Sequence, residues 1–450
     1  MNDLPDKLFL NLHRLGIMHV LACRSHNVRQ RVLQEAHFNT DLISGELSRL
    51  DMVTDSRMHK VSRRAVSLAG KGAVEAGFMM LAATFQEFFG YRFVLPVSQG
   101  RLAEHLLTGS LAGENAIVPN NVLFVTTRLH HELAGARIEE LPVPEAYDLK
   151  SEHPFKGNMD LHRLRAALEQ DAGRIPYVMM ETAVNATGGH PVSMANVRAV
   201  HELVQAHGVP LYLDTSRILE NAWLIREREN GYGQASLREI VREFCSCSDG
   251  CTMSATKDFP ADTGGFVATN DEAVFYKCRD RMMMTGDGLS VREKSILNRA
   301  LGAMRNGDRQ IRRRVRLSHT LWQQLARHGV PVVRPAAGHG VFINAEALCR
   351  RVGKNAHGPK AFLAELYRRS GILGAENSIG NIQRQNRTVL LRFAVPLDGV
   401  TKRDMQYAAR RIARLWADND RIPGLKRTHM PPCRSGEFIS HYARLQEKGG

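Results

Sequence analysis

The sequence contains no apolar run of about 18 residues, the length that a membrane-spanning helix needs, so we expect no membrane partner. The first 24 residues hold only short apolar patches, which charged residues and histidine interrupt. They lack the apolar core of a secretory signal, and we therefore expect a cytoplasmic protein.

Cysteine is also scarce, with seven among 450 residues. In a cytoplasmic chain this content favours reduced thiols over a disulfide framework. Cys245, Cys247 and Cys251 lie close together, but their C-x-C-x3-C spacing matches no standard zinc pattern and no second half follows. We interpret them as small buried hydrophobic residues and expect no metal site.

Aromatic residues make up only 6% of the chain, and they do not alternate with basic residues. The net charge of +15 would suit a nucleic-acid partner. However, Lys and Arg are spread along the sequence and form a single block at Arg312–Arg316. This pattern favours a solvated, Arg-rich surface without a nucleic-acid partner.

What is present is core material and alternating strand and helix patterns. The chain has 43% hydrophobic and 24% charged residues, as globular proteins do. Strands are predicted at 91–97, 121–130, 137–143, 177–184 and 209–214, with helices at 75–89, 161–170 and 194–208. This alternation predicts an α/β fold with a mainly parallel sheet flanked by helices.

The remaining sequence predicts an arm and a smaller α+β domain. Residues 1–50 are expected to form an N-terminal arm that joins the small domain, 51–310 the large domain, and 311–450 the small domain. In the last of these, strands are predicted at 330–334, 340–345 and 388–395, with helices at 360–371 and 401–416.

Polar residues stand where the predicted strands of the large domain end. Asn185 and Asp214 each follow a buried strand, and Gln99, Gly100 and Arg101 connect a strand to a helix. Ligands of open α/β sheets bind at such strand ends, and a helix N-terminus binds anions. Capping of the next helix is an equal alternative for Asp214 taken alone.

Lys257 stands in a turn of small residues, CTMSATKDFPADTGG, where a solvated surface lysine is the alternative. An aldehyde cofactor needs a lysine, a carboxylate for its ring nitrogen, a side chain against the ring face and a phosphate cradle. The candidates for these four parts are Lys257, Asp214, Phe124 and the turn at 99–101.

Several long segments, in this order, resemble one known family. They are QEAHFNT, TDS, FGYRFVLPVSQGR, FVTTRLHHELAGA, PFKGNMDL, NATGGHPVSMANVRAVHE, YLDTSRILENAWLIREREN, DGCTMSATKD, GVPVVRPAAGHGVF and LLRFAVP. The chain is thus similar to the β-eliminating lyases, the tryptophanase and tyrosine phenol-lyase family of pyridoxal-phosphate enzymes of fold type I. The phenol-lyase branch is the nearer resemblance.

The resemblance implies a role for each matching residue. Lys257 would carry the cofactor and act as the base at Cα, with Asp214 at the ring nitrogen and Arg392 on the substrate carboxylate. His339 matches an active-site histidine, with a simple turn histidine as the alternative. The other implied contacts are the ring (Phe124), its oxygen (Asn185, Arg217), the phosphate (Gln99, Gly100, Arg101, Ser254), and the phosphate or substrate from a neighbouring subunit (Thr54, Ser56).

The sequence also departs from the family at several positions. A tyrosine that protonates the leaving group falls near Gly72, beside Lys71, and no tyrosine lies between 52 and 89. Arg57 and Gly70 replace ligands of a monovalent cation, so we expect the K+ site to be lost. Further replaced contacts are those at Val125, Thr256 and Asn377.

These features predict a pyridoxal-phosphate lyase that forms pyruvate and ammonia from an L-α-amino acid by β-elimination through an aminoacrylate. Its specificity is expected to differ from tyrosine and tryptophan. β-Replacement, transamination and retro-aldol cleavage are the rival reactions, and a catalytically silent cofactor-bound regulator or scaffold is the non-enzymatic alternative. The resemblance also implies a homo-oligomer, a dimer or a dimer of dimers, with shared active sites.

Overall fold

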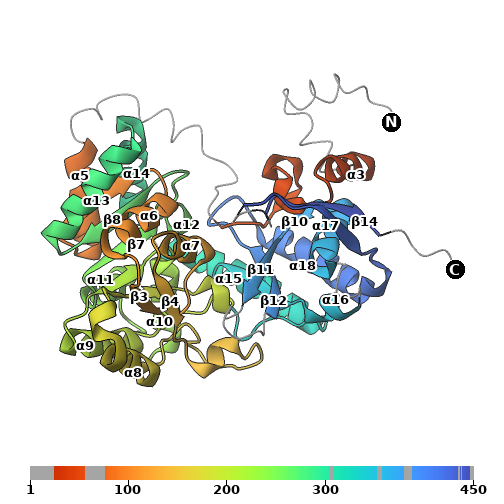
Figure 1. Ribbon diagram of the computed structural model, residues 1–450. Coiled ribbons are helices and arrows are strands. Elements are labelled where there is room, and N and C mark those ends of the chain that lie inside the picture. The colour runs from red at the N-terminus through yellow and green to blue at the C-terminus, as the bar shows by residue number, and fades with distance from the viewer. Residues whose placement is uncertain are drawn as a thin grey trace.

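The computed structural model describes residues 25–55, 77–304, 308–351, 357–379, 388–433, 436 and 438–445. Its largest element is a seven-stranded sheet with the order β2-β8-β7-β6-β5-β3-β4 (Figure 1). Strand β8 is antiparallel to both neighbours, and the other neighbouring pairs are parallel, which confirms the predicted fold class. The strands are β2 (Phe93–Val97), β3 (Ile117–Asn120), β4 (Arg137–Glu140), β5 (Val178–Glu181), β6 (Leu211–Asp214), β7 (Gly250–Ser254) and β8 (Gly265–Thr269).

Side chains of the central strands alternate between two apolar layers. Leu211 and Leu213 belong to one buried cluster, and Tyr212 between them belongs to another. This period of two buries both faces of the sheet beneath helices. The first layer includes α5 (Gly77–Phe89), α8 (Leu161–Asp171), α9 (Met194–Ala206), α10 (Ile218–Arg228), α11 (Leu237–Ser246) and α14 (Val291–Ala303), and the second includes α6 (Gly100–Leu111) and α13 (Glu272–Thr285).

The predicted strand at 121–130 is wrong. Strand β3 ends at Asn120, and helix α7 (Val125–Leu133) begins after the extended residue Phe124. The β-branched residues Val125, Thr126 and Thr127 suggest a strand, but intrinsic propensity is a weak prior that packing overrides. Here α7 packs against α6.

A second group of elements surrounds a three-stranded antiparallel sheet of order β11-β12-β9. The predicted strand at 330–334 is wrong, because Val332 forms only an isolated bridge to Ile343. Pro331 and Pro335 lack the N–H groups that a strand ladder uses. The elements are α3 (His26–Glu35), β1 (Leu50–Asp51), β9 (Gly340–Asn344), α16 (Glu346–Arg351), α17 (Gly358–Ser370), β10 (Ile372–Leu373), β11 (Ala375–Ile379), β12 (Thr388–Ala394), α18 (Lys402–Ala417), β13 (Leu425–His429) and β14 (His441–Arg444).

Helix α15 (Asp308–Arg327) connects these two groups of elements (Figure 1). Its first turns contribute Ile311 and Val315 to the core of the large sheet, and Leu321 and Leu325 belong to the core of the small sheet. One helix thereby contributes to both cores. The domain boundaries at residues 50 and 310 stay a prediction.

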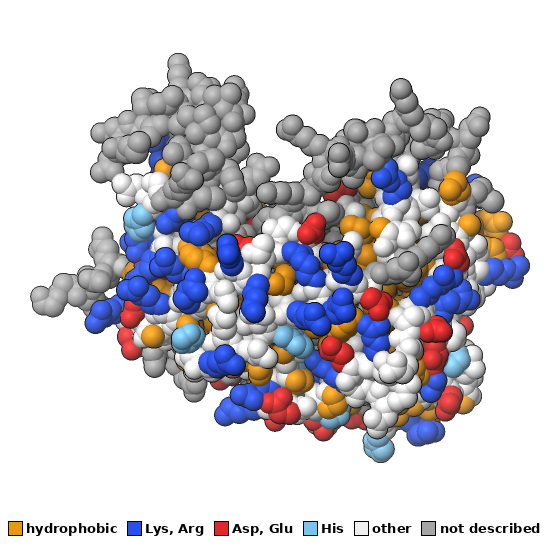
Figure 2. Space-filling view, turned by 180° about the vertical axis from the view of Figure 1, so that it is seen from behind, with side chains coloured by type: hydrophobic (Ala, Val, Ile, Leu, Met, Phe, Trp, Pro, Cys, Tyr) orange, Lys and Arg blue, Asp and Glu red, His pale blue; other side chains and the backbone are white. Residues whose placement is uncertain are grey.

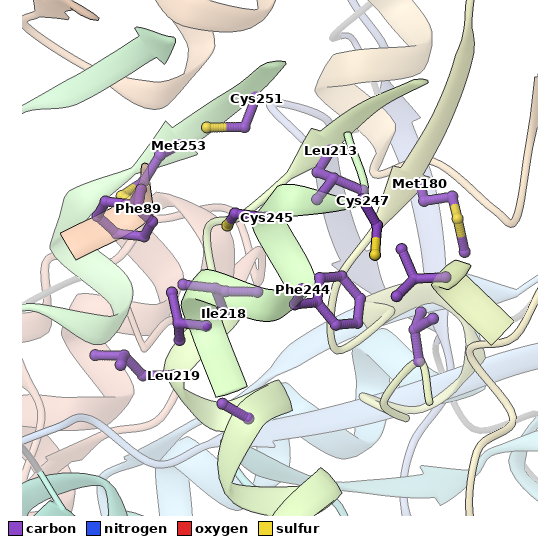
Figure 3. Packing of buried hydrophobic residues seen from close by; sticks show 14 of the residues in the cluster. Phe89, Met180, Leu213, Ile218, Leu219, Phe244, Cys245, Cys247, Cys251 and Met253 are labelled. Atoms are coloured by element: carbon purple, nitrogen blue, oxygen red, sulfur yellow. The ribbon is translucent and has the colours of Figure 1, made fainter. Parts of the chain in front are cut away.

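The cysteines follow the sequence interpretation. Cys245, Cys247 and Cys251 are buried and unbonded to one another. Figure 3 shows them among apolar side chains of the large core, including Phe89, Leu213 and Phe244. They act as small core residues.

Basic side chains are widely distributed on one face of the protein. On the face seen in Figure 2, Lys and Arg side chains are spread among acidic and apolar ones. Within the described ranges, no helix is long and apolar enough to cross a membrane.

Candidate active site

Four predicted site residues lie at one edge of the large sheet. Asp214 and Ser254 end β6 and β7, Asn185 follows β5, and Gly100 follows β2. The strands β5, β6 and β7 are parallel neighbours, so their carboxyl ends meet at this edge. This is where α/β sheets bind ligands.

The turn before α6 is built for close approach of an anion. Gln99 is the N-cap of α6, but its side chain makes no capping hydrogen bond, so N–H groups of the first turn remain available. A Cβ on Gly100 would lie 2.5 Å from Ser254 Cβ, and one on Gly265 would lie 2.8 Å from Gly100 N. A side chain at either position would clash, so glycine at both positions allows the N-terminus of α6 to lie in contact with Ser254.

Lys257 lies on the short helix α12 (Ala255–Asp258), which follows β7 directly. Its Nζ is 5.3 Å from the centre of the Phe124 ring, so the end of the lysine and the aromatic face lie next to one another. The Lys257 carbonyl oxygen accepts a hydrogen bond from Arg314 Nη1 at 2.7 Å. The backbone of the lysine is therefore fixed from the α15 side.

Arg314 is the centre of a buried ionic network beneath Lys257. Its Nη2 donates to Asp258 Oδ1 at 2.5 Å and to Glu220 Oε2 at 3.0 Å, and all three side chains are fully buried. Asp258 Oδ2 also accepts from the backbone N–H groups of Leu219 and Glu220 at the start of α10. The network joins α10, α12 and α15 at the site.

His339 links this network to Asn185. Its Nδ1 lies 2.9 Å from Glu220 Oε1, and its Nε2 lies 3.4 Å from Asn185 Oδ1. Burial would raise the pKa of Glu220, but His339 and Arg314 outweigh it and lower that pKa. Ionised Glu220 only accepts hydrogen bonds, so His339 donates from Nδ1. His339 is thus a fully buried part of the site.

Arg217 is held by a residue far away in the sequence. Its Nε and Nη2 donate to the two carboxylate oxygens of Asp55 at 2.7 and 3.0 Å. Burial opposes the charge of Arg217, but the Asp55 carboxylate outweighs it and raises its pKa. The pair anchors the segment after β1 to the edge of the large sheet.

Arg392 reaches the same place from β12. It donates from Nη1 to Asn185 Oδ1 and from Nη2 to the Val53 carbonyl, both at 2.8 Å. Its buried Nε has no partner in the described part of the chain. Burial lowers the pKa of Arg392 to about 10. Asn377 on β11 donates to the Asn185 carbonyl oxygen at 3.2 Å. The small sheet thereby closes over Asn185.

Some of the remaining predicted residues lie near the site, and others lie outside the described ranges. Arg101 and Gln99 are exposed at the α6 turn, and Thr54 lies beside Asp55 in the segment that Arg217 and Arg392 hold. Val125 next to Phe124 is half exposed. Five residues lie outside the described ranges: Ser56, Arg57, Gly70, Lys71 and Gly72.

The sequence analysis missed Arg314, Glu220, Asp258 and Asp55 as site residues. A signal existed for Arg314, because Ile311, Arg314, Val315 and Ser318 lie at helical i, i+3, i+4 and i+7 spacing on the buried face of α15. An arginine within such a stripe indicates a buried ion pair. Asp55 lies in the TDS segment between the predicted residues Thr54 and Ser56, but nothing in that segment indicates its pairing with Arg217.

Solved structures with the same architecture identify the fold. Serine palmitoyltransferase from S. paucimobilis, with a bound PLP–myriocin aldimine, matches with a TM-score of 0.60 at 14% identity, covering 82% of this chain and 87% of that one. Threonine aldolase from Leishmania major matches with a TM-score of 0.58 at 13% identity, covering 81% and 99%. The fold is that of fold type I pyridoxal-phosphate enzymes.

Sequence comparisons identify the family. Residues 51–348 match the family described as beta-eliminating lyase. Tyrosine phenol-lyase from Symbiobacterium sp. (strain SC-1) is 34% identical over 438 residues, 93% of this chain and 95% of that protein. Tryptophanase from Hyphomonas neptunium is 33% identical over 462 residues, 98% and 100%. The chain therefore belongs to the β-eliminating lyase family and is a pyridoxal-phosphate-dependent lyase.

Proposed function

We propose that this lyase acts on an L-α-amino acid by β-elimination and releases pyruvate and ammonia. The observation that carries the proposal is the position of Lys257 Nζ, 5.3 Å from the centre of the Phe124 ring. Both residues follow strands of the large sheet, at the edge where β6 ends with Asp214. The family description, beta-eliminating lyase, supports the class of reaction.

Each residue around the ring has its own task in this proposal. Pyridoxal phosphate, when bound, supplies an electron sink for the pair left at Cα when a proton is removed. Lys257 would hold the cofactor and take that proton. Asp214 would keep the ring nitrogen protonated, because an opposite charge nearby favours the charged form. Phe124 would lie against the ring face.

Different residues would bind the cofactor's phosphate and its ring oxygen. The uncapped N-terminus of α6, with Gln99, Gly100, Arg101 and Ser254, would receive the phosphate. Asn185 and Arg217 would hold the ring oxygen, and Thr54 and Ser56 would add contacts from a neighbouring subunit. The available N–H groups at Gly100 are the observation that favours this placement of the phosphate.

Arg392 would bind the carboxylate of the substrate. Its Nε is buried and has no partner among the described side chains and backbone groups, so a ligand carboxylate would satisfy it. A guanidinium matches a carboxylate with two parallel hydrogen bonds, which an ammonium group cannot do. Lying within hydrogen-bond distance of Asn185, it would orient the amino acid with Cα toward Lys257.

The leaving group would differ from phenol and indole. Asn377 stands where the resembled phenol-lyases have an arginine, and its side chain is engaged with the Asn185 backbone. Val125 has no hydroxyl to offer a phenol. A leaving group that departs without an acid, such as a thiolate, suits a sequence in which the family's tyrosine falls near Gly72 and no tyrosine lies between 52 and 89.

The active enzyme would be a cytoplasmic homo-oligomer, a dimer or a dimer of dimers. Val125 and Leu133, at the two ends of the helix α7 that follows Phe124, are 50% and 59% exposed. A second copy would cover these apolar side chains and complete the site with Thr54 and Ser56. The resemblance to the family is the other support for this assembly.

The rival reactions give different products. β-Replacement forms a new amino acid, transamination a 2-oxo acid without ammonia, and retro-aldol cleavage an aldehyde. A scaffold forms no product. The buried Arg392 guanidinium, proposed to bind the substrate carboxylate, argues against this alternative.

A panel of L-amino acids with thiol, hydroxyl and aromatic β-substituents tests the proposal. The expected result is equal amounts of pyruvate and ammonia from at least one of them, abolished in Lys257→Ala. Arg410→Lys, an exposed change on α18, should leave turnover unchanged. Product formation without pyruvate from every amino acid would refute β-elimination.

A further inference from the structure

A second carboxyl group lies beside Asp214 in the large sheet. Glu181 ends β5, and in the parallel register it is the partner of Asp214 at the end of β6. Paired residues on neighbouring strands project to the same face of a sheet. Both side chains are buried, with 3% and 4% exposed. The role proposed for Asp214 takes no account of this neighbour.

The hydrogen bonds of Glu181 satisfy only one of its oxygens. Oε1 accepts from the Asn185 backbone N–H at 2.9 Å, whereas the buried Oε2 has no partner among the residues that the structure describes. Asp214 Oδ1 accepts from the Ser216 backbone N–H at 2.9 Å. Within the described ranges, neither carboxyl group has a Lys, Arg or His within ion-pair distance. Two adjacent buried charges would therefore be uncompensated.

Other charged groups surround the pair from several elements. Arg217 and, to a smaller extent, Lys257 on α12 favour the ionised form of Glu181, but Arg217 is already paired with Asp55. Glu104 on α6 adds a third buried carboxyl group; burial and then Asp214 raise its pKa to about 7. Like charges in a buried site disfavour joint ionisation. Burial, and then the charge of Asp214, raise the pKa of Glu181 to about 8.

We propose that Glu181 is a positioning residue that stays protonated at neutral pH, so that the Glu181–Asp214 pair presents a single negative charge to the cofactor's ring nitrogen. The ring-nitrogen part rests on the proposed function, whereas the protonation of Glu181 does not. A proton on Oε2 also turns this oxygen into an O–H donor, which can form a hydrogen bond with the Asp214 carboxylate. A second charge would arise only as the pH passes about 8.

The protonation is tested on the protein without cofactor, by comparing wild type with Glu181→Gln. A raised carboxyl pKa gives stability that is complete below the unfolded pKa, near 4.5, and is lost as the pH rises through the folded pKa, near 8. The wild-type unfolding constant should rise about tenfold per pH unit relative to Glu181→Gln across this window. Above it, the ratio should be constant.

Glu169→Gln is the matched control, because Glu169 is exposed on α8; its ratio to wild type should not vary over the same window. Glu181→Met, of similar volume, should behave as Glu181→Gln does and serves if that variant does not fold. Titration of Glu104 cancels in each ratio. A constant ratio from pH 5 to 8 for both Glu181 variants would overturn the proposal, because Glu181 would then be ionised throughout.

The second arm uses the loaded protein and the visible absorbance of its cofactor. Wild type and Glu181→Gln should have the same spectrum below pH 7 and diverge above pH 8, where only wild type gains a charge. Spectra that agree at every pH, together with a positive result without cofactor, would overturn the ring-nitrogen role alone. Failure to bind any cofactor would contradict the proposed function and leave the protonation result standing.

Discussion

Replacing Arg314 by methionine should destabilise the protein strongly. The change removes hydrogen bonds from Arg314 to Asp258, Glu220 and the Lys257 carbonyl, and leaves two carboxylates in the core. Breaking a buried ion pair from one side costs about 3–5 kcal/mol. Asp258 keeps two backbone N–H donors and Glu220 keeps His339 and the Gly338 N–H, so we expect a loss near the lower end, about 3 kcal/mol.

The assay is urea unfolding followed by tryptophan fluorescence, since Trp223 lies on α10 beside the network. Arg316→Met is the matched control: it is exposed on the same helix and should change the unfolding free energy by less than about 0.5 kcal/mol. Asp258→Asn added to Arg314→Met should recover part of the loss, because one uncompensated charge disappears. An Arg314→Met protein as stable as the Arg316→Met control would refute the account of the network.

Two further substitutions test the proposed binding of the substrate carboxylate and of the cofactor phosphate. Arg392→Lys keeps the charge but removes the fork, so KM for the amino acid should rise about tenfold or more; steady-state kinetics with an unchanged KM would exclude Arg392 as the carboxylate ligand. Gly100→Ala places a methyl group 2.5 Å from Ser254 Cβ, so cofactor binding should weaken roughly tenfold, or ~1.4 kcal/mol. In equilibrium dialysis, Gly113→Ala, with open space around it, should bind as wild type does.

Much of the fold followed from local pattern. The strand that ends at Asp214 and the helices around it were predictable because apolar runs of the right length lie between turn residues. The interpretation of 121–130 as a strand failed because Val125, Thr126 and Thr127 lie in the first turn of α7, where packing against α6 outweighs their β preference. Such packing between elements has no local signal.

The site was predictable where single residues end strands, and less so where residues pair over long distances. Asn185, Asp214 and Gly100 follow from the strand-end rule. The Arg217–Asp55 pair joins residues 162 positions apart, and the sequence alone gives no indication of which acid meets which arginine. Glu181 was not predicted as a site residue because it lies within an apolar run, although an acid in a buried strand is itself unusual.

The most direct test of the account is to find the lysine that carries the cofactor. Reduction of the loaded protein with borohydride, followed by peptide mass mapping, should locate pyridoxal phosphate on Lys257. Lys156 is the competing residue, because it is also buried and burial lowers its pKa to about 8; its Nζ, however, donates to the Asp148 and Arg334 carbonyl oxygens. Label on Lys257 is the predicted result, and label on Lys156 or on no lysine would contradict the proposed site.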